Sequence, residues 1–337
     1  PNLKSDAQAW LAGGKIQRVL EEPYSFDDSL ATVRPVVGIA SFPEQADSAE
    51  QLVVRADIAK RMARSRDVAQ HVFQNEDQRE TGAYLGLEGP LREAIRNNLL
   101  EVHYQPQINI KTGACQAVEG LLRWTHPEQG PIAPPAIVRI AEANGMIGQL
   151  TVWVLNTVLR NQAEWKRQGV SLHAGMNLST VTLTDTSLPD VITQAMGTWG
   201  ADPAMLTLEI TETATIGDAG QSLAIMNRLK KTGIRLSVDD FGTGYSSLSY
   251  VKTFPLDELK IDKLFVQHMR ASKGDQQIVR SVIDLAHNFE LTVVAEGVED
   301  EATFKDLKKM GCDLVQGFYF SPALPSTELL AWLPRRR

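Results

Sequence analysis

The stretch Ile234–Leu248, IRLSVDDFGTGYSSL, runs from an apolar segment into two adjacent carboxylates and then into two glycines. Asp239 and Asp240 repel each other as neighbouring like charges, and at the edge of an apolar core they also lose hydration. A bound cation is the simplest compensation for both costs. Gly242 and Gly244 predict a mobile or sharply turned loop after the acids. A tight strand-to-helix connection without function is the alternative.

Apolar runs that lead into polar residues recur along residues 85–337. Short apolar runs alternate there with longer amphipathic segments, which is typical of βα units around a parallel sheet. The region is also close in length to the ~250 residues of a (β/α)₈ barrel. We therefore predict an α/β fold with a TIM-type barrel as its main part. The amphipathic segments predict helices at Leu188–Trp199, Ala219–Lys231, Asp275–Asn288 and Glu301–Met310.

Each apolar run holds or ends in polar residues that can take part in chemistry. A barrel places the carboxyl ends of its strands on one face, so these groups would meet at one mouth. Helix caps explain an Asp or an Asn at such a position, but they do not explain the glutamates, the lysine or the glutamine. The residues are Glu119, Asn177, Glu209, Asp239, Asp240, Lys260, Asp262, Glu296, Glu299 and Gln316.

Six of these residues form a set of oxygen ligands. Five carboxylates and one amide, with no Cys or His among them, suit Mg²⁺ or Mn²⁺ rather than zinc. Five carboxylates exceed the charge of one divalent ion, so two ions that share a carboxylate at ~3.5–4 Å balance the set better. Asp239 could bridge the two ions, and Asp240 could reach the second. The set is Glu119, Asn177, Glu209, Asp239, Asp240 and Glu296.

Two such ions suit a displacement at phosphorus, because they activate a water and stabilise the charge that develops on the phosphoryl group. Lys260 could orient the attacking water or stabilise the same negative charge. A plain salt bridge between Lys260 and a neighbouring acid is the alternative that the sequence leaves open.

Composition narrows the class of protein. A hydrophobic fraction of 43% and a charged fraction of 22% are ordinary for a globular chain. No apolar run approaches the roughly 18 residues that span a bilayer. The formal net charge of −7 argues against a nucleic-acid polymer as partner. Cys115 and Cys312 suggest no disulfide framework, so a cytoplasmic location is expected.

The first part of the chain has a different pattern of apolar and helical segments. Ala7–Leu20 and Ala49–Arg66 have helical patterns, with the apolar run Val33–Ala40 between them. Polar residues follow and indicate a linker. We predict three parts, at residues 1–74, 75–84 and 85–337. Pro1 stands where an initiator Met would be, so we expect the chain to be a piece of a longer protein.

Eight ordered motifs of the larger part carry a family signature. They are YQPQ (Tyr104–Gln107), VEGLLRW (Val118–Trp124), MNLS (Met176–Ser179), LEITET (Leu208–Thr213), VDDFGTGYSSL (Val238–Leu248), LKID (Leu259–Asp262), AEGVE (Ala295–Glu299) and QGF (Gln316–Phe318). Together they closely resemble the EAL domain, a cyclic di-GMP phosphodiesterase, over residues 85–334. The resemblance implies a modified TIM (β/α)₈ barrel, two Mg²⁺ or Mn²⁺ ions, and hydrolysis of cyclic di-GMP to linear 5′-pGpG.

The resemblance also implies a role for each matching residue. The implied ligands of the first metal are Glu119, Asn177, Glu209 and Asp239. Asp240 and Glu296 would serve the second metal and its water, with Asp239 as the bridge. Lys260 would contact the attacking water, and Glu299 would steady the DFGTGYSSL loop. The implied substrate-binding residues are Gln105, Leu122, Arg123, Asp262 and Gln316. Arg123 also has a direct rationale, because a guanidinium pairs well with phosphate or guanine edges.

Val37–Arg66 resembles the second half of a GGDEF domain, the diguanylate cyclase fold. No GGDEF stretch occurs in these 337 residues, so this partial α/β segment should have no cyclase activity. In the larger part, Gly120 replaces the Ala that is usual in the family's signature tripeptide, which should loosen the strand slightly but keeps Glu119. The resemblance further implies a homodimer through the EAL domain, and sensory or membrane segments upstream of this chain.

Two other functions stay open. A receptor that binds cyclic di-GMP without hydrolysing it could share every motif, because loop geometry can silence a site whose ligands are intact. An enzyme of another kind on the same barrel is the second, since a fold does not determine a function.

Overall fold

The computed structural model describes residues 6–21, 24–26, 29–31, 35–65, 68–74, 86–211, 219–242 and 248–333. The chain divides into two compact units, Pro1–Gly89 and Pro90–Arg337. The predicted linker, 75–84, lies outside the described residues, so the predicted domain limits stay predictions. The elements of the first unit are α1 (Asp6–Leu20), β1 (Tyr24–Phe26), β2 (Ser29–Ala31), β3 (Val37–Ile39), α2 (Ala49–Ser65) and β4 (Gln70–Val72).

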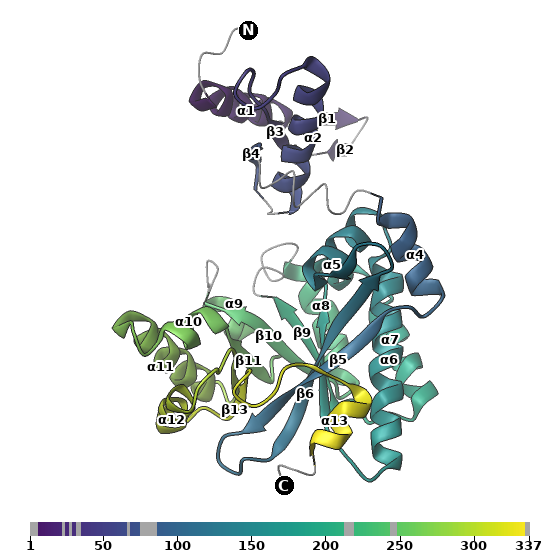
Figure 1. Cartoon of the computed structure of the whole chain (residues 1–337), viewed down its shortest axis with the longest axis vertical. Coiled ribbons are helices and arrows are strands. Elements are labelled where there is room, and N and C mark those ends of the chain that lie inside the picture. Colours follow the sequence, from purple (N-terminus) through teal and green to yellow (C-terminus); the bar gives the residue numbers. More distant parts are fainter. Residues whose placement is uncertain are drawn as a thin grey trace. The chain divides into compact units, whose positions relative to one another are not determined.

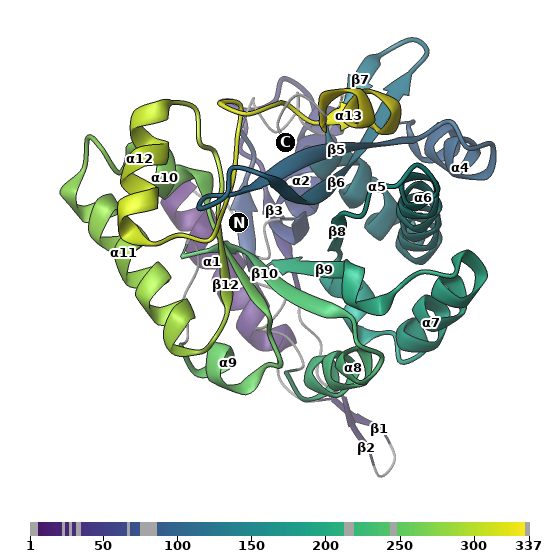
Figure 2. The same ribbon diagram turned by 90° about the horizontal axis from the view of Figure 1, so that it is seen from below.

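Eight strands of the second unit close into a barrel, which Figure 2 shows with helices around the outside. The strand order is β5-β13-β12-β11-β10-β9-β8-β6, and β6 pairs back with β5. The strands are β5 (Glu101–Asn109), β6 (Cys115–His126), β8 (His173–Leu178), β9 (Leu206–Thr211), β10 (Arg235–Phe241), β11 (Glu258–Ile261), β12 (Thr292–Ala295) and β13 (Leu314–Gln316).

Seven of these strands are parallel to one another, and β5 runs antiparallel to both of its neighbours, β6 and β13. This is the modification of the simple (β/α)₈ plan. Two short strands extend the sheet: β7 (Gly130–Ile132) pairs with β6, and β14 (Leu324–Pro325) pairs with β5. The predicted α/β barrel is therefore confirmed, with one reversed strand at its closure.

The helices of the second unit lie around the strands, as Figure 1 shows. Three of them, α7, α8 and α12, have the bounds that the sequence predicts. The helices are α4 (Glu88–Arg96), which straddles the unit boundary, α5 (Pro134–Ala143), α6 (Ile147–Arg167), α7 (Leu188–Trp199), α8 (Ala219–Lys231), α9 (Leu248–Thr253), α10 (Lys263–His268), α11 (Lys273–Asn288), α12 (Glu301–Met310), α13 (Ser326–Trp332) and the 3₁₀ turns η1 (Thr180–Thr184) and η2 (Pro203–Met205).

Helix α11 illustrates how the sequence determines these outer helices. Its buried residues Val279, Val282, Ile283 and Ala286 recur at the spacing of one helix face, so they form a stripe against the barrel. The helix begins at Ser272, whose hydroxyl accepts a hydrogen bond from the backbone N–H of Asp275 at 3.2 Å. The apolar stripe and the cap together define where the helix lies and where it starts.

The barrel strands are buried on both sides, because helices cover the outside and side chains fill the inside. On β10, Leu236 and Val238 are buried apolar residues, and Ser237 and Asp239 alternate with them on the other face. The same alternation on β11 puts Glu258 and Lys260 on one face. The inward-facing positions of these strands are therefore the ones that carry polar groups.

The first unit contains a parallel pair of strands, β3 and β4, joined by α2. Its small core consists of Ile58, Ala59, Met62 and Phe73. The expected helical patterns agree with α1 and α2, and the expected apolar run contains β3. Gly38 on β3 is required by close packing, because a Cβ at this position would lie 2.1 Å from the carbonyl oxygen of Ala56 in α2.

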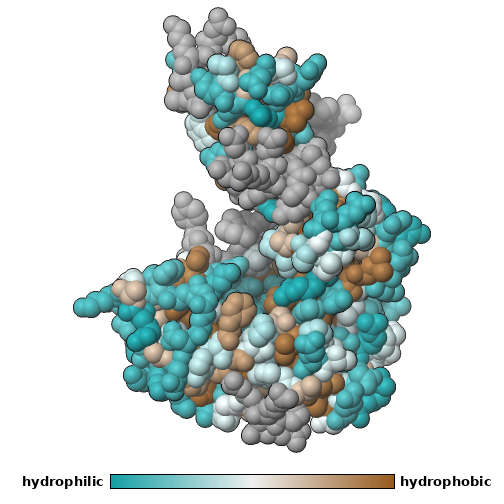
Figure 3. All heavy atoms as spheres, viewed as in Figure 1, coloured by the Kyte–Doolittle hydropathy of each residue, from teal (hydrophilic) through white to brown (hydrophobic). Residues whose placement is uncertain are grey.

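Within the described residues, none of the helices is both long enough and apolar enough to cross a membrane. On the face in Figure 3, the described part of the second unit is mostly hydrophilic, with small hydrophobic areas between.

We expect Gly38→Ala to loosen the first unit, because overpacking against backbone costs roughly 1–3 kcal/mol. Amide hydrogen exchange of Phe73, whose N–H donates to Ile39 O at 2.8 Å, reports the β3–β4 pairing. Gly14→Ala is the matched control, since its Cβ would meet only one atom, at 3.8 Å. Equal protection of the Phe73 amide in both variants would contradict the packing argument.

Candidate metal centre

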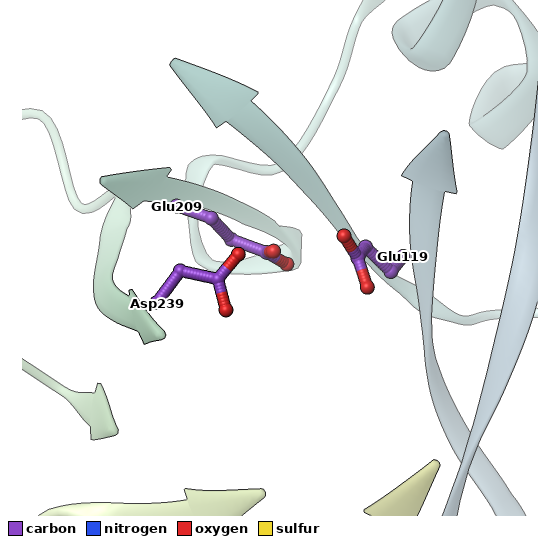
Figure 4. A group of neighbouring side chains, drawn as sticks. All are labelled: Glu119, Glu209 and Asp239. Atoms are coloured by element: carbon purple, nitrogen blue, oxygen red, sulfur yellow. The ribbon is translucent and has the colours of Figure 1, made fainter. Parts of the chain in front are cut away.

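Polar side chains from neighbouring barrel strands converge inside the barrel. Glu119 comes from β6, Glu209 from β9 and Asp239 from β10, and Figure 4 shows that their carboxylates point toward one another. Asn177 on β8 is the register partner of Glu209. The parallel strands thus bring together residues that are far apart in sequence. The other members are Lys260 on β11, Glu296 after β12 and Gln316 on β13.

Lys260 lies at the centre of this group with its side chain fully buried. Its Nζ is 2.6 Å from Glu296 Oε1 and 2.7 Å from Glu209 Oε2. It is also 3.2 Å from Glu119 Oε2 and 3.2 Å from Asp239 Oδ1. One ammonium cannot neutralise four carboxylates. The group therefore carries excess negative charge where little water can screen it.

Two sets of three carboxylates are close enough to surround a small cation. The sets are Glu119, Glu209 and Asp239, and Asp239, Asp240 and Glu296, with the ligand oxygens of each set within 4.8 Å of one another. Asp239 belongs to both sets, which is the position that the sequence predicts for a bridging ligand. All these donors are oxygen atoms, and Lys260 leaves their charge only partly balanced. The residues therefore fit hard divalent cations such as Mg²⁺ or Mn²⁺.

Amide side chains hold Glu119 in position. Asn177 Nδ2 donates to Glu119 Oε1 at 2.9 Å, and Gln316 Nε2 donates to Glu119 Oε2 at 2.6 Å. Gln316 Nε2 also donates to Gln105 Oε1 at 3.0 Å. Both carboxylate oxygens are thus oriented by donors from other strands. Such supporting hydrogen bonds fix the direction in which a carboxylate presents its free lone pairs.

Gln107 belongs to this network, although the sequence analysis does not include it among the site residues. Its Nε2 donates to Gln316 Oε1 at 3.0 Å, and the residue is 3% exposed. The signal was the motif YQPQ: Gln105 and Gln107 are two residues apart on β5 and so share one face of the strand. An inward-facing pair of glutamines predicts a shared polar partner.

Asp240 adopts a backbone conformation that is rare for residues with a side chain. Its φ is 56°, and its N–H donates to Asp239 Oδ1 at 3.0 Å. Burial, the charge of Asp239 and the neighbouring Asp262 raise the pKa of Asp240 to about 7. Gly242 has a φ of 101°, as expected of a sharp turn. The predicted loop residue Gly244 lies outside the described residues.

Burial dominates the ionisation of the other acids. It raises the pKa of Glu209 and of Asp239, against the attraction of Lys260. It also raises the pKa of Glu296 to about 8, with Lys260 again opposing the shift. For Glu119, burial is outweighed by the charge of Lys260 and by hydrogen bonds from Gln316 and Asn177, so its pKa is lowered. Positive charge in addition to that of Lys260 is therefore needed to keep all the carboxylates of the site ionised.

The remaining predicted residues lie around this centre. Leu122 and Arg123 are half-buried on β6, and Arg123 Nη1 donates to the carbonyl of Leu122 at 2.9 Å. Asp262 caps α10 by accepting from Leu264 N–H at 2.6 Å. Glu299 is exposed and accepts from Gln267 Nε2 at 2.8 Å. Residues 243–247, most of the loop that Glu299 is expected to steady, lie outside the described residues, and the roles of all four stay predictions.

Two glycines beside the ligands differ in how much space surrounds them. A Cβ on Gly120 would lie 3.1 Å from Gly175 O and 3.2 Å from Val102 Cγ1, so the missing methyl leaves no void. A Cβ on Gly175 would lie 1.9 Å from Glu209 Oε1. Gly175 therefore makes room for the Glu209 carboxylate.

The sequence matches the family model described as EAL domain over residues 89–323. This chain belongs to the EAL domain family. The match covers the whole barrel as far as the residues before β14, and it leaves α1, α2 and the strands β1 to β4 outside.

Curated relatives extend the similarity beyond the EAL domain. The cyclic di-GMP phosphodiesterase NbdA of Pseudomonas aeruginosa is 35% identical over 335 residues, which are 98% of this chain and 43% of that protein. The bifunctional diguanylate cyclase/cyclic di-GMP phosphodiesterase MucR of the same organism is 33% identical over 97% of this chain and 48% of that protein. The chain thus spans less than half the length of either relative.

Solved structures confirm the barrel fold of the EAL domain. The PaMucR phosphodiesterase in complex with c-di-GMP has a TM-score of 0.69 and 38% identity, covering 72% of this chain and 99% of that one. The EAL enzyme Bd1971, with cAMP and cyclic-di-GMP bound, has a TM-score of 0.71 and 26% identity, covering 86% of this chain and 77% of that one.

We expect Gly175→Ala in the EAL domain to displace Glu209 and to weaken Mn²⁺ binding by roughly 10- to 100-fold, the usual cost of disturbing a ligand's setting. Titration calorimetry measures the affinity, and circular dichroism checks the fold. Gly197→Ala on α7 is the control, because nothing lies within 4 Å of its added Cβ. Wild-type affinity in Gly175→Ala would show that Glu209 does not depend on this gap.

Metal binding should also depend on pH. Because Glu296 has a pKa of about 8 and Asp240 a pKa of about 7, both carry protons in the metal-free protein below these values. A cation must displace those protons, so we expect Mn²⁺ affinity to rise from pH 6 to pH 9. Calorimetry in two buffers of different ionisation enthalpy measures the protons released at pH 7. No release would show that both acids are already ionised.

Proposed function

We propose that the EAL domain of this chain hydrolyses cyclic di-GMP to linear 5′-pGpG and so lowers the level of a bacterial second messenger. One observation carries the proposal: four carboxylates surround a single buried lysine inside the barrel, and two of them, Asp239 and Glu296, form a second triad with Asp240. Such an excess of oxygen ligands suits metal-assisted attack on a phosphodiester. The similarity to NbdA, a cyclic di-GMP phosphodiesterase, and to the PaMucR phosphodiesterase in complex with c-di-GMP supports the choice of substrate.

We assign two ions, Mg²⁺ or Mn²⁺, to this centre. Asp239 would be shared by both, as its membership of two carboxylate triads supports. When bound, the ions supply activation of a water and neutralisation of charge on the phosphate. The assigned ligands are Glu119, Asn177, Glu209 and Asp239 for the first ion, and Asp239, Asp240 and Glu296 for the second.

The side chains of the protein have separate tasks in this scheme. Lys260 is a buried donor whose Nζ can hold the attacking water and stabilise negative charge on the phosphate oxygens. Gln316 and Asn177 keep the Glu119 carboxylate in one orientation. Because these groups are held by the barrel, they need little rearrangement when substrate binds. Glu299 would act at a distance, by steadying the loop that follows Asp240.

Substrate binding is assigned to residues on the strands β5, β6 and β13 and to one residue that follows β11. Arg123 is half-buried, and its guanidinium can reach a phosphate or a guanine edge. Gln105 already connects Gln316 to the backbone of Ser321, so it lies between the metal centre and the C-terminal strand. The full set is Gln105, Leu122, Arg123, Asp262 and Gln316.

For the first unit we propose descent from the second half of a GGDEF domain. The relative MucR, which is named as bifunctional, aligns with 97% of this chain, so the alignment includes much of the first unit. No GGDEF stretch is present, and we assign no cyclase activity to it. A homodimer through the EAL domain, upstream sensory or membrane segments in the parent protein, and a cytoplasmic location stay predictions.

The proposal is tested by incubating the chain with cyclic di-GMP and Mg²⁺ or Mn²⁺ and resolving the products by chromatography. We expect 5′-pGpG, and none with a chelator. Glu119→Gln should lower kcat by about 100-fold or more, because it removes a ligand charge. Glu128→Gln, at an exposed turn position, is the matched control and should be unaffected.

Each other outcome has a defined meaning. Tight binding of cyclic di-GMP without product would place the chain among receptors. Turnover that survives both the chelator and Glu119→Gln would overturn the assignment of the metal centre. Absence of both binding and turnover would overturn the proposed substrate.

A further inference from the structure

A second polar space lies on the amino-terminal side of the metal centre. We call this space the rear chamber. Its volume is about 110 Å³, and Glu209 of the metal centre is one of its lining residues. Thr207, Arg235, Glu258 and Thr292, at the amino-terminal ends of β9 to β12, contribute to its wall. Its far end is therefore the end of the barrel opposite the carboxyl ends of the parallel strands.

Glu258 is the unusual residue of the rear chamber. It is 5% exposed, and no ion pair links it to another described residue. Ser237 faces it from β10 as its register partner; the Ser237 hydroxyl lies close enough to interact with the Glu258 carboxylate, but it reaches full hydrogen-bonding geometry with no described group. A buried carboxylate without an ion pair in direct contact is costly. The chamber has room for several water molecules, which would hydrate Glu258 and satisfy Ser237.

Glu258 also lies directly behind Lys260. The two residues are two positions apart on β11, so both side chains enter the barrel, one above the other. Their opposite charges attract, and Arg235 adds a second, more distant positive charge. Glu258 belongs to neither carboxylate triad. It is therefore an acid near Lys260 that is not a candidate metal ligand.

The need for such an acid arises when metals bind. The ammonium of Lys260 lies among four carboxylates. Divalent ions would compete for those carboxylates and would also repel the ammonium, while little solvent screens the charges. A negative charge on the side away from the ions would oppose that repulsion.

We propose that Glu258 is a positioning residue, which holds the Lys260 ammonium in place when divalent ions occupy the carboxylates. The inference rests on the proposed function, because that function is what requires the ions and Lys260 together. It adds to the site a residue outside the ligand set, and it gives the rear chamber a role as the hydrated support of the metal centre.

A double-mutant cycle tests the link between Glu258 and Lys260. Mn²⁺ affinity is measured by titration calorimetry on the purified full chain without substrate. We expect Glu258→Gln, which removes the charge and keeps the shape, to weaken binding by about tenfold or more. In the Lys260→Met background the same substitution should change the affinity by less than about twofold, since nothing is left to position.

Two further variants keep the test sharp. Glu258→Asp retains the charge and should retain most of the Mn²⁺ affinity. Glu93 is exposed on α4 and is not a residue of the metal centre. Glu93→Gln removes one negative charge there and should leave the Mn²⁺ affinity unchanged. Thermal unfolding of each metal-free variant separates loss of fold from loss of metal binding. If Glu258→Gln does not fold, the same cycle is run with Glu258→Thr, which also removes the charge, in both Lys260 backgrounds.

The proposal is overturned if Glu258→Gln weakens Mn²⁺ binding equally in the two backgrounds, or in neither. Hydrolysis of cyclic di-GMP by the wild-type chain is assayed separately. Turnover without coupling would retain the proposed function and reject the role of Glu258. Coupling without turnover would do the reverse, so the two failures are distinguishable.

Discussion

The attraction between one buried ammonium and the four carboxylates around it is the interaction on which the rest of this site depends. Lys260 has no access to water, and every one of its acidic neighbours comes from a different barrel strand or from the residue after one. Removing the ammonium would leave four acidic side chains without a positive charge among them in a medium of low polarity. The strands can converge at this point because Lys260 places a positive charge among the carboxylates, and because Gly175 leaves room for the Glu209 carboxylate.

The barrel determines the direction in which each side chain of the site points. Alternation along each strand sends every second side chain inward, and the parallel register sets Asn177 beside Glu209 and Glu209 beside Ser237. Apolar residues facing outward pack under the helices and keep the strands rigid. The antiparallel β5 then brings Gln105 and Gln107 to the edge between β13 and β6, where they support Gln316. A rigid scaffold of this kind suits a site that must hold like charges together.

Much of this arrangement follows from the sequence. The periods of 3.6 and 2 residues place the helices α7, α8 and α12 and the strands that carry the acids, and the hard-ligand set follows from residue type alone. Other features depend on contacts between distant segments, which no local pattern encodes. The reversal of β5, the bond from Gln107 to Gln316 and the chamber around Glu258 are of this kind. Glu258 in particular has the local context of an ordinary strand residue, and only its three-dimensional neighbours show that it is buried near Lys260 and Arg235.

The shared position of Asp239 has a consequence for how the protein would respond to its surroundings. Because one carboxylate belongs to both triads, a cation at one position would alter the charge and the orientation available to the other. The two positions would then be thermodynamically linked and would not fill independently. Two cations that share a ligand also repel each other, so the second would bind more weakly than the first, and occupancy would rise over a wider range of free cation concentration than at a single position.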